Sequence, residues 1–222
     1  MAYPNNSIWI AIFPATILIV YAITAAPTKA SWVVGFVAGF SFYASQIPWM
    51  TVYLGPVPWL ALSFLEAVIF AVGALAINWS WNSRILLDSP IMRAASIASL
   101  WVAREWLACN FPYGGFPWSR LALSQSNSPL ANWAYWGGLS LVSWIVAFTS
   151  VLVMLTWQTK LRPAHWSNSP VAATLVLIFL IPQMTNLSLA PTSKSINVAA
   201  VQGNANAGLF ANPVPGSILQ NH

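Results

Sequence analysis

The sequence is poor in charged side chains. Only 3 acidic and 8 basic residues occur among 222, so charged residues make up 5% of the chain, whereas soluble domains contain about 25%. Apolar residues make up 58%, and the mean hydropathy is +0.68. Because so few charged groups cannot cover a surface in water, the composition excludes a water-soluble globule and predicts that lipid is the main solvent.

Two further shortages exclude particular kinds of site. The net charge of +5 comes from basic residues scattered singly, without the cluster that a phosphate backbone requires, so we expect no nucleic-acid partner. Cys109 is the only cysteine, which excludes an internal disulfide framework and any multi-cysteine zinc or iron–sulfur site. The sequence contains no phosphate-cradling loop and no HExxH motif. We therefore expect neither a metal nor a cofactor.

Long apolar runs dominate what is present. A run of roughly 17 to 25 residues is long enough to cross a bilayer core as a helix. Six such runs are present, at residues 8–26, 31–53, 57–78, 91–109, 133–157 and 170–189. The sequence therefore predicts an all-α polytopic membrane protein with about six transmembrane helices, forming a domain over residues 1–190.

The distribution of Lys and Arg predicts the orientation, because these residues are enriched in cytoplasmic loops. One set of loops holds Lys29, Arg84, Arg93, Lys160 and Arg162. The opposite set holds Arg120 and Lys194, with Arg104 inside the end of the fourth run. We therefore expect the first set to be cytoplasmic, and both termini and the loop at 110–132 to face outward.

The composition changes after residue 190. Residues 195–204 read as a short buried strand followed by a turn. One strand cannot form a domain, because a sheet needs partners to pair its backbone and bury its faces. We expect residues 191–222 to be the start of a second, non-membrane domain that is truncated after its first strand.

Residues 101–125 hold the candidate site. Two adjacent opposite charges end the fourth run, and a loop rich in aromatic residues, proline and glycine follows. Such a loop could form a rigid wall for a lipid, or it could be an interfacial anchor whose charges only satisfy each other. The candidate lipid-contact or interdomain-contact residues are Arg104, Glu105, Gly115, Phe116, Pro117, Trp118 and Gln125.

The third run contains an intramembrane carboxylate, Glu66, about nine residues or roughly 14 Å from the outer end. A carboxylate at that depth is costly unless it is paired or protonated, and such groups often mark functional sites. We favour a structural role that holds helices together, with Arg104 or Ser and Trp side chains as partners. In the second run, Gly35 and Gly39 form a small-xxx-small pattern, which predicts close approach of another helix, first within the molecule and second in a dimer.

Several short motifs carry a resemblance to a known family. The segments Glu105-Trp106-Leu107, Gly115-Phe116-Pro117-Trp118, Ser124-Gln125, Ser128-Pro129-Leu130 and Gly137-Gly138 resemble the membrane domain of bacterial apolipoprotein N-acyltransferases, especially actinobacterial ones. Residues 198–204 are similar to the first strand of the α/β nitrilase-like domain that follows on the extracytoplasmic side in that family. The resemblance covers the whole chain but only the amino-terminal part of the family's length.

The resemblance implies an enzyme of lipoprotein biosynthesis in the bacterial cytoplasmic membrane. In that family a Cys thiolate takes an acyl chain from a phospholipid, and the chain passes to the α-amino group of a lipoprotein's diacylglyceryl-modified cysteine. The nucleophilic Cys, a Glu base and an oxyanion-stabilising Lys lie in the nitrilase-like domain, beyond residue 222 of this chain. Cys109 has no histidine near it in the sequence and is not expected to be a nucleophile. We therefore expect no catalytic residue in this chain, and no activity from it alone.

Two alternatives from other classes remain. The chain could be a non-enzymatic module that binds lipid or docks a separately encoded nitrilase-like domain. It could also be a small transporter, which predicts a polar pathway and inverted repeats. Glu66 is the only polar-pathway candidate, and the halves show no convincing repeat.

Overall fold

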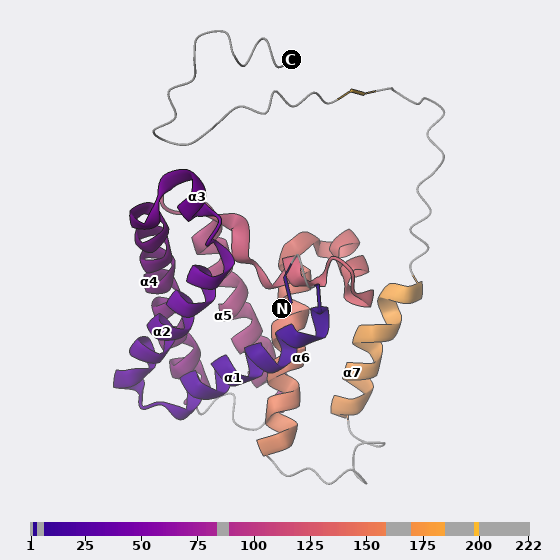
Figure 1. Ribbon diagram of the computed structural model, residues 1–222. Coiled ribbons are helices and arrows are strands. Elements are labelled where there is room, and N and C mark those ends of the chain that lie inside the picture. Colours follow the sequence, from indigo (N-terminus) through magenta and orange to yellow (C-terminus); the bar gives the residue numbers. More distant parts are fainter. Residues whose placement is uncertain (1, 4–6, 84–88, 159–169, 185–197, 200–222) are drawn as a thin grey trace.

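The computed structural model describes residues 2–3, 7–83, 89–158, 170–184 and 198–199, and every regular element within them is helical. The α-helices are α1 (Ile12–Ala25), α2 (Thr28–Gln46), α3 (Met50–Leu54), α4 (Pro56–Trp81), α5 (Pro90–Asn110), α6 (Ala134–Gln158) and α7 (Pro170–Leu180) (Figure 1). Short 3₁₀ helices lie at Trp9–Ala11, Pro117–Ser119, Leu121–Gln125, Pro129–Trp133 and Ile181–Met184. The all-helical prediction is confirmed for this part of the chain.

The predicted strand at 195–204 falls almost wholly outside the described residues. Val198 and Ala199, which are described, belong to no helix or strand. The strand, and the domain boundary placed at residue 190, stay predictions.

Each of the six apolar runs contains a helix, but the second run is divided. Residues 31–53 were expected to be continuous, whereas α2 ends at Gln46 and the short α3 starts at Met50. Pro48 lies between them, where its missing N–H and its ring oppose continuation of a helix. Gly55, with φ of +81°, then turns the chain into α4.

Two helices begin with conventional start signals. Ser89 caps α5 by accepting a hydrogen bond from the Met92 N–H at 3.2 Å, and Pro90 occupies the first helical position. Pro56 occupies the same position in α4. These local signals place the starts of α4 and α5 one residue before the apolar runs that begin at residues 57 and 91.

Two stretches of the described chain are long and apolar enough to cross a membrane, Pro56–Trp81 and Pro129–Gln158. The first and last apolar runs form shorter helices, Trp9–Ala25 and Pro170–Met184. Helices α2 and α5 have 19 and 21 residues and do not meet the same test of length and apolar composition. The number of six spans therefore stays a prediction.

Helix α4 is apolar outside and partly polar inside. Its exposed face carries large apolar side chains at helical spacing, namely Val57, Leu60, Phe64, Val68, Val72, Leu75 and Trp79. Its buried face includes Ser63, Glu66 and Asn78, each at most 1% exposed. In water the reverse arrangement is expected, because large contiguous apolar patches are rarely exposed on soluble monomers. The arrangement of side chains around α4 therefore fits a helix surrounded by lipid.

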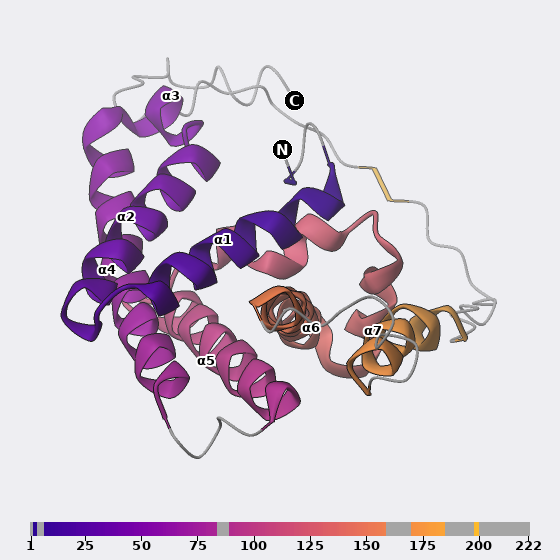
Figure 2. The same ribbon diagram turned by 90° about the horizontal axis from the view of Figure 1, so that it is seen from below.

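The two glycines of α2 lie against α4, and these helices run side by side (Figure 2). A Cβ atom on Gly39 would meet the Phe70 Cβ at 2.6 Å, and one on Gly35 would overlap the Ala74 Cβ. The glycines therefore permit a backbone approach that no larger residue allows. The prediction of close packing within the molecule is confirmed.

The ends of the helices alternate between two ends of the bundle. Figure 1 shows α3, residues 111–133 and the end of α7 at one end, called here the loop end, and the α1–α2 turn and the end of α6 at the other. Helix α7 is attached at the loop end, where Trp133 Nε1 donates to Ile178 O at 2.9 Å and Asn132 Nδ2 donates to Pro182 O at 3.1 Å. The loop end is where the predicted site residues of α5 and its following loop lie.

Candidate functional site

The loop that follows α5, residues 111–120, folds back onto the last turn of that helix; we call it the aromatic loop. The Phe116 N–H donates to the Ala108 carbonyl at 2.7 Å, and the Gly115 N–H donates to the Pro112 carbonyl at 2.8 Å. Gly115 has φ of +70°, and a Cβ built on it would overlap the backbone of Cys109 and Asn110. Gly115 is therefore needed both for its conformation and for the close approach.

Replacing Gly115 by alanine should cost more stability than replacing its neighbour Gly114. Both residues have positive φ, but a Cβ at Gly114 meets nothing within 4 Å. We expect the strain of positive φ in both variants and about 1–3 kcal/mol more in Gly115→Ala, because overpacking adds to it. Denaturation of the purified chain in mixed detergent micelles would measure both free energies of unfolding. Equal losses in the two variants would show that the loop is not seated on α5.

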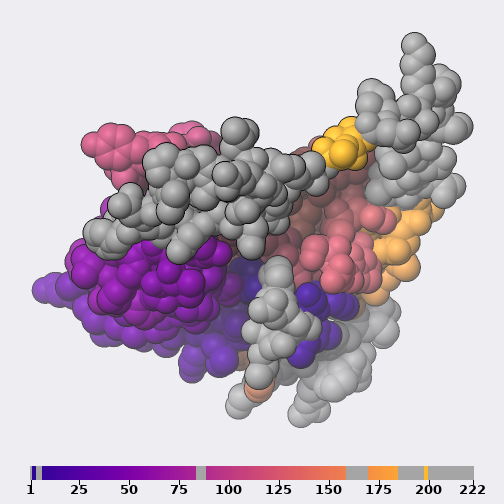
Figure 3. Space-filling view, turned by 45° about the horizontal axis from the view of Figure 1, so that its top comes forward, coloured from indigo at the N-terminus to yellow at the C-terminus, as the bar shows by residue number. Residues whose placement is uncertain are grey.

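Aromatic side chains of the loop meet Trp49, which precedes α3, and Tyr53, which lies in α3, at the surface. The Phe116 and Trp118 rings stack with centroids 6.2 Å apart, and Trp118 lies 5.5 Å from Trp49, which lies 6.4 Å from Tyr53. We call Trp49, Tyr53, Phe116 and Trp118 the aromatic platform. Figure 3 shows the loop standing out from the neighbouring helices. Trp and Tyr in such a position suit the interface between lipid and water.

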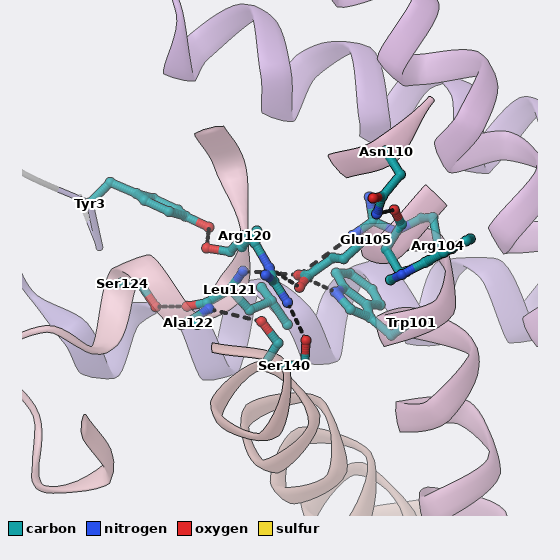
Figure 4. Close-up of polar contacts among 12 residues, drawn as sticks. Tyr3, Trp101, Arg104, Glu105, Asn110, Arg120, Leu121, Ala122, Ser124 and Ser140 are labelled. Atoms are coloured by element: carbon teal, nitrogen blue, oxygen red, sulfur yellow. Dashed lines mark hydrogen bonds and ion pairs between the residues drawn. The ribbon is translucent and has the colours of Figure 1, made fainter. Parts of the chain in front are cut away.

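The Glu105 carboxylate lies beneath the loop and holds its end. Glu105 is 2% exposed, and its Oε1 accepts hydrogen bonds from Trp101 Nε1 at 3.1 Å and from the Leu121 N–H at 2.9 Å (Figure 4). Its Oε2 pairs with Arg120 Nε at 3.4 Å. Because Leu121 and Arg120 end the loop, one buried carboxylate fixes the loop to α5. Charge-assisted hydrogen bonds of this kind are stronger than neutral ones.

Arg120 connects three parts of the loop end. Its Nη2 donates to Ser140 Oγ in α6 at 2.7 Å, and its carbonyl accepts a hydrogen bond from the Tyr3 hydroxyl at 3.1 Å. The Ala122 N–H donates to Ser143 Oγ at 3.1 Å. The amino-terminal residues, the loop and α6 are therefore joined around the same ion pair, as Figure 4 shows.

Arg104 is buried between aromatic rings, at 4% exposure. Its guanidinium carbon lies 4.3 Å from the Phe70 ring centroid and 4.9 Å from that of Trp101. Its Nη1 donates to the Tyr43 hydroxyl at 3.3 Å, and its Nη2 lies 3.8 Å from Glu105 Oε1. Cation–π contact and ion pairing together compensate for the removal of this charge from water.

Glu66 is also buried, at 1% exposure. The Tyr43 hydroxyl and the Arg104 guanidinium both interact with the Glu66 carboxyl. Its Oε2 has no hydrogen-bond partner among the described residues. Arg104, one of the partners expected for Glu66, therefore interacts with this carboxyl, and Arg104 also donates a hydrogen bond to Tyr43.

Gln125 lies apart from the aromatic loop. It is fully buried, and its Nε2 donates to Ser124 Oγ at 2.9 Å and to the Trp9 carbonyl at 3.3 Å. The structure thus brings Arg104, Glu105 and the segment Gly115–Trp118 together, with Arg104 and Glu105 inside and Phe116 and Trp118 at the surface. The contact roles predicted for these residues stay predictions.

Sequence reasoning missed Tyr43, Ser140 and Tyr3. Tyr43 and Ser140 lie in helices among other small or aromatic residues, and nothing local distinguishes them from packing residues.

Cys109 is half-buried, and no group of three His, Cys, Asp or Glu side chains in the described residues could hold a metal.

The sequence has recognisable relatives. Residues 1–152 match the family described as the apolipoprotein N-acyltransferase N-terminal domain. The apolipoprotein N-acyltransferase of Mycolicibacterium smegmatis is 34% identical over 247 aligned positions, which cover 100% of this chain and 39% of the relative. That of Azotobacter vinelandii is 31% identical over 205 positions, 85% of this chain and 38% of the relative.

These matches agree with the motifs at residues 105–138, including the likeness to actinobacterial proteins. The chain spans about two-fifths of the length of the curated relatives it matches. Members of this family are bacterial membrane enzymes, which agrees with the exposed apolar side chains of α4. The chain therefore belongs to the apolipoprotein N-acyltransferase family, whose N-terminal domain it matches.

Proposed function

We propose that this chain forms the polytopic membrane part of an apolipoprotein N-acyltransferase. The observation that carries the proposal is the family match over residues 1–152. Helix α4, with apolar side chains outside and polar ones inside, adds a physical reason for a lipid environment. The activity is N-acylation of lipoproteins at the outer face of the bacterial cytoplasmic membrane.

In the proposed topology, all six apolar runs cross the membrane and the loop end faces outward. The alternation of helix ends in Figure 1 supports this arrangement. The excess of Lys and Arg in the loops of the opposite end supports its direction. The segment after α7 then begins on the extracytoplasmic side, where the acyl acceptor is presented.

The proposed donor is a phospholipid, and the proposed acceptor is the α-amino group of a diacylglyceryl-modified cysteine. The Cys thiolate attacks the ester carbonyl of the phospholipid, and the ester C–O bond breaks to release a protonated lysophospholipid and leave a thioester. The amine then attacks the thioester carbonyl and loses a proton, and the C–S bond breaks to release the thiolate. The Cys, its Glu base and the oxyanion-stabilising Lys belong to the nitrilase-like domain, on the same polypeptide or on a separate one. Residues 1–222 alone are therefore proposed to be inactive.

The proposed contribution of this chain is to present the lipid at the loop end. Trp49 and Trp118 are 40% and 55% exposed, and their indoles suit the headgroup level. Beneath them, Glu105 and Arg120 hold the loop rigidly enough for it to act as a wall. Arg104 and Glu105 serve this role from the interior, without touching the lipid.

Complementation would test the proposed activity. A strain depleted of its own apolipoprotein N-acyltransferase would receive residues 1–222 alone, or a chimera in which residues 1–190 replace the aligned region of the Azotobacter vinelandii relative. We expect the chimera to restore N-acylated lipoproteins, detected by mass spectrometry of their amino-terminal peptides, and residues 1–222 alone to restore none.

The matched control is the same chimera with the relative's catalytic cysteine replaced by alanine, which must be inactive. A chimera that reaches the membrane in normal amounts without acylating lipoproteins would contradict the proposed role. Acylation by residues 1–222 alone would contradict the assignment of the reacting groups to the nitrilase-like domain. A lipid-binding module without a part in acyl transfer would give the first of these results.

A further inference from the structure

Glu66, Arg104, Glu105 and Arg120 form one continuous network of buried or partly buried charges. The two acidic side chains in the described residues are Glu66 and Glu105, and both interact with Arg104. The network runs from Glu66 in α4 through Tyr43 in α2 to Arg104 and Glu105 in α5, and ends at Arg120. Helices α2 and α4 are thereby connected to the carboxylate that holds the aromatic loop.

The contact between Arg104 and Glu105 is not a local property of α5. Consecutive residues of a helix point in different directions and do not face each other. Their approach to 3.8 Å requires the Arg104 side chain to be held by other elements. The network is therefore set by tertiary packing.

Helices α2 and α4 supply that restraint. Gly73 leaves room for the aliphatic part of Arg104, because a Cβ there would meet the Arg104 Cδ at 2.8 Å. Phe70 lies over the guanidinium, and the Tyr43 hydroxyl accepts from its Nη1 at 3.3 Å. Together these contacts hold the Arg104 guanidinium close to the Glu105 carboxylate.

We propose that Arg104 and Tyr43 are positioning residues for the aromatic loop, acting through the Glu105 carboxylate. Arg104 attracts Oε1, the same atom that accepts the Leu121 N–H. Without Arg104, the carboxylate is drawn toward Arg120 alone, and the hydrogen bond to Leu121 weakens. The loop then opens more often from α5, although no loop residue has changed. The inference concerns the seating of the loop; its importance for acyl transfer rests on the function proposed above.

The single native cysteine provides the measurement. Cys109 is half-buried. Gly115 packs so closely against the Cys109 backbone that a Cβ on Gly115 would not fit between them. We expect opening of the loop, which moves Gly115 away from the Cys109 backbone, to increase access to this thiol, so the rate of reaction with a water-soluble maleimide reports local opening. The experiment uses the whole 222-residue chain in detergent micelles and in phospholipid vesicles.

We expect Tyr43→Phe, which removes one hydroxyl, to raise the labelling rate of Cys109 about fivefold, as loss of one net hydrogen bond predicts. Arg104→Gln should raise the rate about tenfold or more, because a charge-assisted contact is lost as well. Arg104→Lys keeps the charge but cannot contact Tyr43 and Glu105 together, and should fall between wild type and Arg104→Gln. This graded rescue distinguishes positioning from simple packing.

The matched control is Arg93→Gln. Arg93 lies near the opposite end of α5, with its guanidinium 4.8 Å from the Trp81 ring centroid, and its loss should leave the labelling of Cys109 unchanged. A second reporter, Met92→Cys in a Cys109→Ala background, monitors that end, where Met92 is exposed. Tyr43→Phe should not change its labelling rate.

Two results would overturn the inference. One is unchanged labelling of Cys109 in both Tyr43→Phe and Arg104→Gln. The other is an equal rise at Cys109 and at the Met92→Cys reporter, which would mean general loss of stability. Neither result depends on acyl transfer, so failure of the complementation experiment and failure of this inference are distinguishable.

Discussion

Replacing Glu105 by alanine is expected to lower the free energy of unfolding by about 3–5 kcal/mol, the usual cost of removing one partner from a buried ion pair. The change leaves Arg104 and Arg120 without their shared carboxylate and removes the acceptor of Trp101 Nε1 and the Leu121 N–H. Buried donors without acceptors add their own desolvation cost. The loss of stability therefore arises from the unpaired arginines and the unsatisfied donors that remain after the substitution.

The measurement is denaturation in mixed detergent micelles followed by circular dichroism. Asn110→Ala is a matched control at the end of the same helix, because it also removes a side-chain hydrogen bond, from Nδ2 to the Trp106 carbonyl at 2.7 Å, but at an exposed site. It should change stability by no more than about 0.5 kcal/mol. A loss below about 1 kcal/mol for Glu105→Ala would mean that the carboxylate does not hold the loop end.

Replacing Gly35 by alanine is expected to destabilise the contact between α2 and α4 by about 1–3 kcal/mol. The new Cβ would overlap the Ala74 Cβ and lie 3.2 Å from the Ala71 Cα. Helix propensity alone predicts the opposite sign, because alanine is favoured over glycine by about 1 kcal/mol. The sign of the measured change therefore decides whether the helices are in close contact.

The reciprocal variant Gly35→Ala with Ala74→Gly makes this test sharper. It moves one methyl group from α4 to α2 and keeps one glycine and one alanine in the pair, so propensity cancels. We expect it to recover most of the stability lost in Gly35→Ala. Val37→Leu, on an exposed face of α2, should have little effect. Additive losses in the double variant would mean that Gly35 and Ala74 do not face each other.

The sequence predicted the helical elements because their signals are local. An apolar run of spanning length is a property of one segment, and each of the six runs contains a helix. The division of residues 31–53 was missed. The apolar composition continues through Pro48, whereas the chain leaves the helical path at that point and continues in α3.

The family could also be recognised from the sequence, because its motifs lie in one segment. The family motifs follow one another between Glu105 and Gly138, and the match over residues 1–152 includes them. The glycine pattern of α2 predicted a close helix contact for the same reason. It did not identify α4 as the neighbour, since any helix could occupy that surface.

By itself, the sequence determined the solvent, the helices and the family of this protein. The tertiary structure decided which side chains work together. Tyr43 and Arg104 are 61 positions apart, Trp49 meets Trp118, and Tyr3 reaches Arg120 only when the bundle is assembled. Composition and periodicity indicate which segments contact lipid and which contact water. The partner of a charge buried between helices depends instead on how those helices pack. The pairing of the few charges in this chain is therefore a property of the fold.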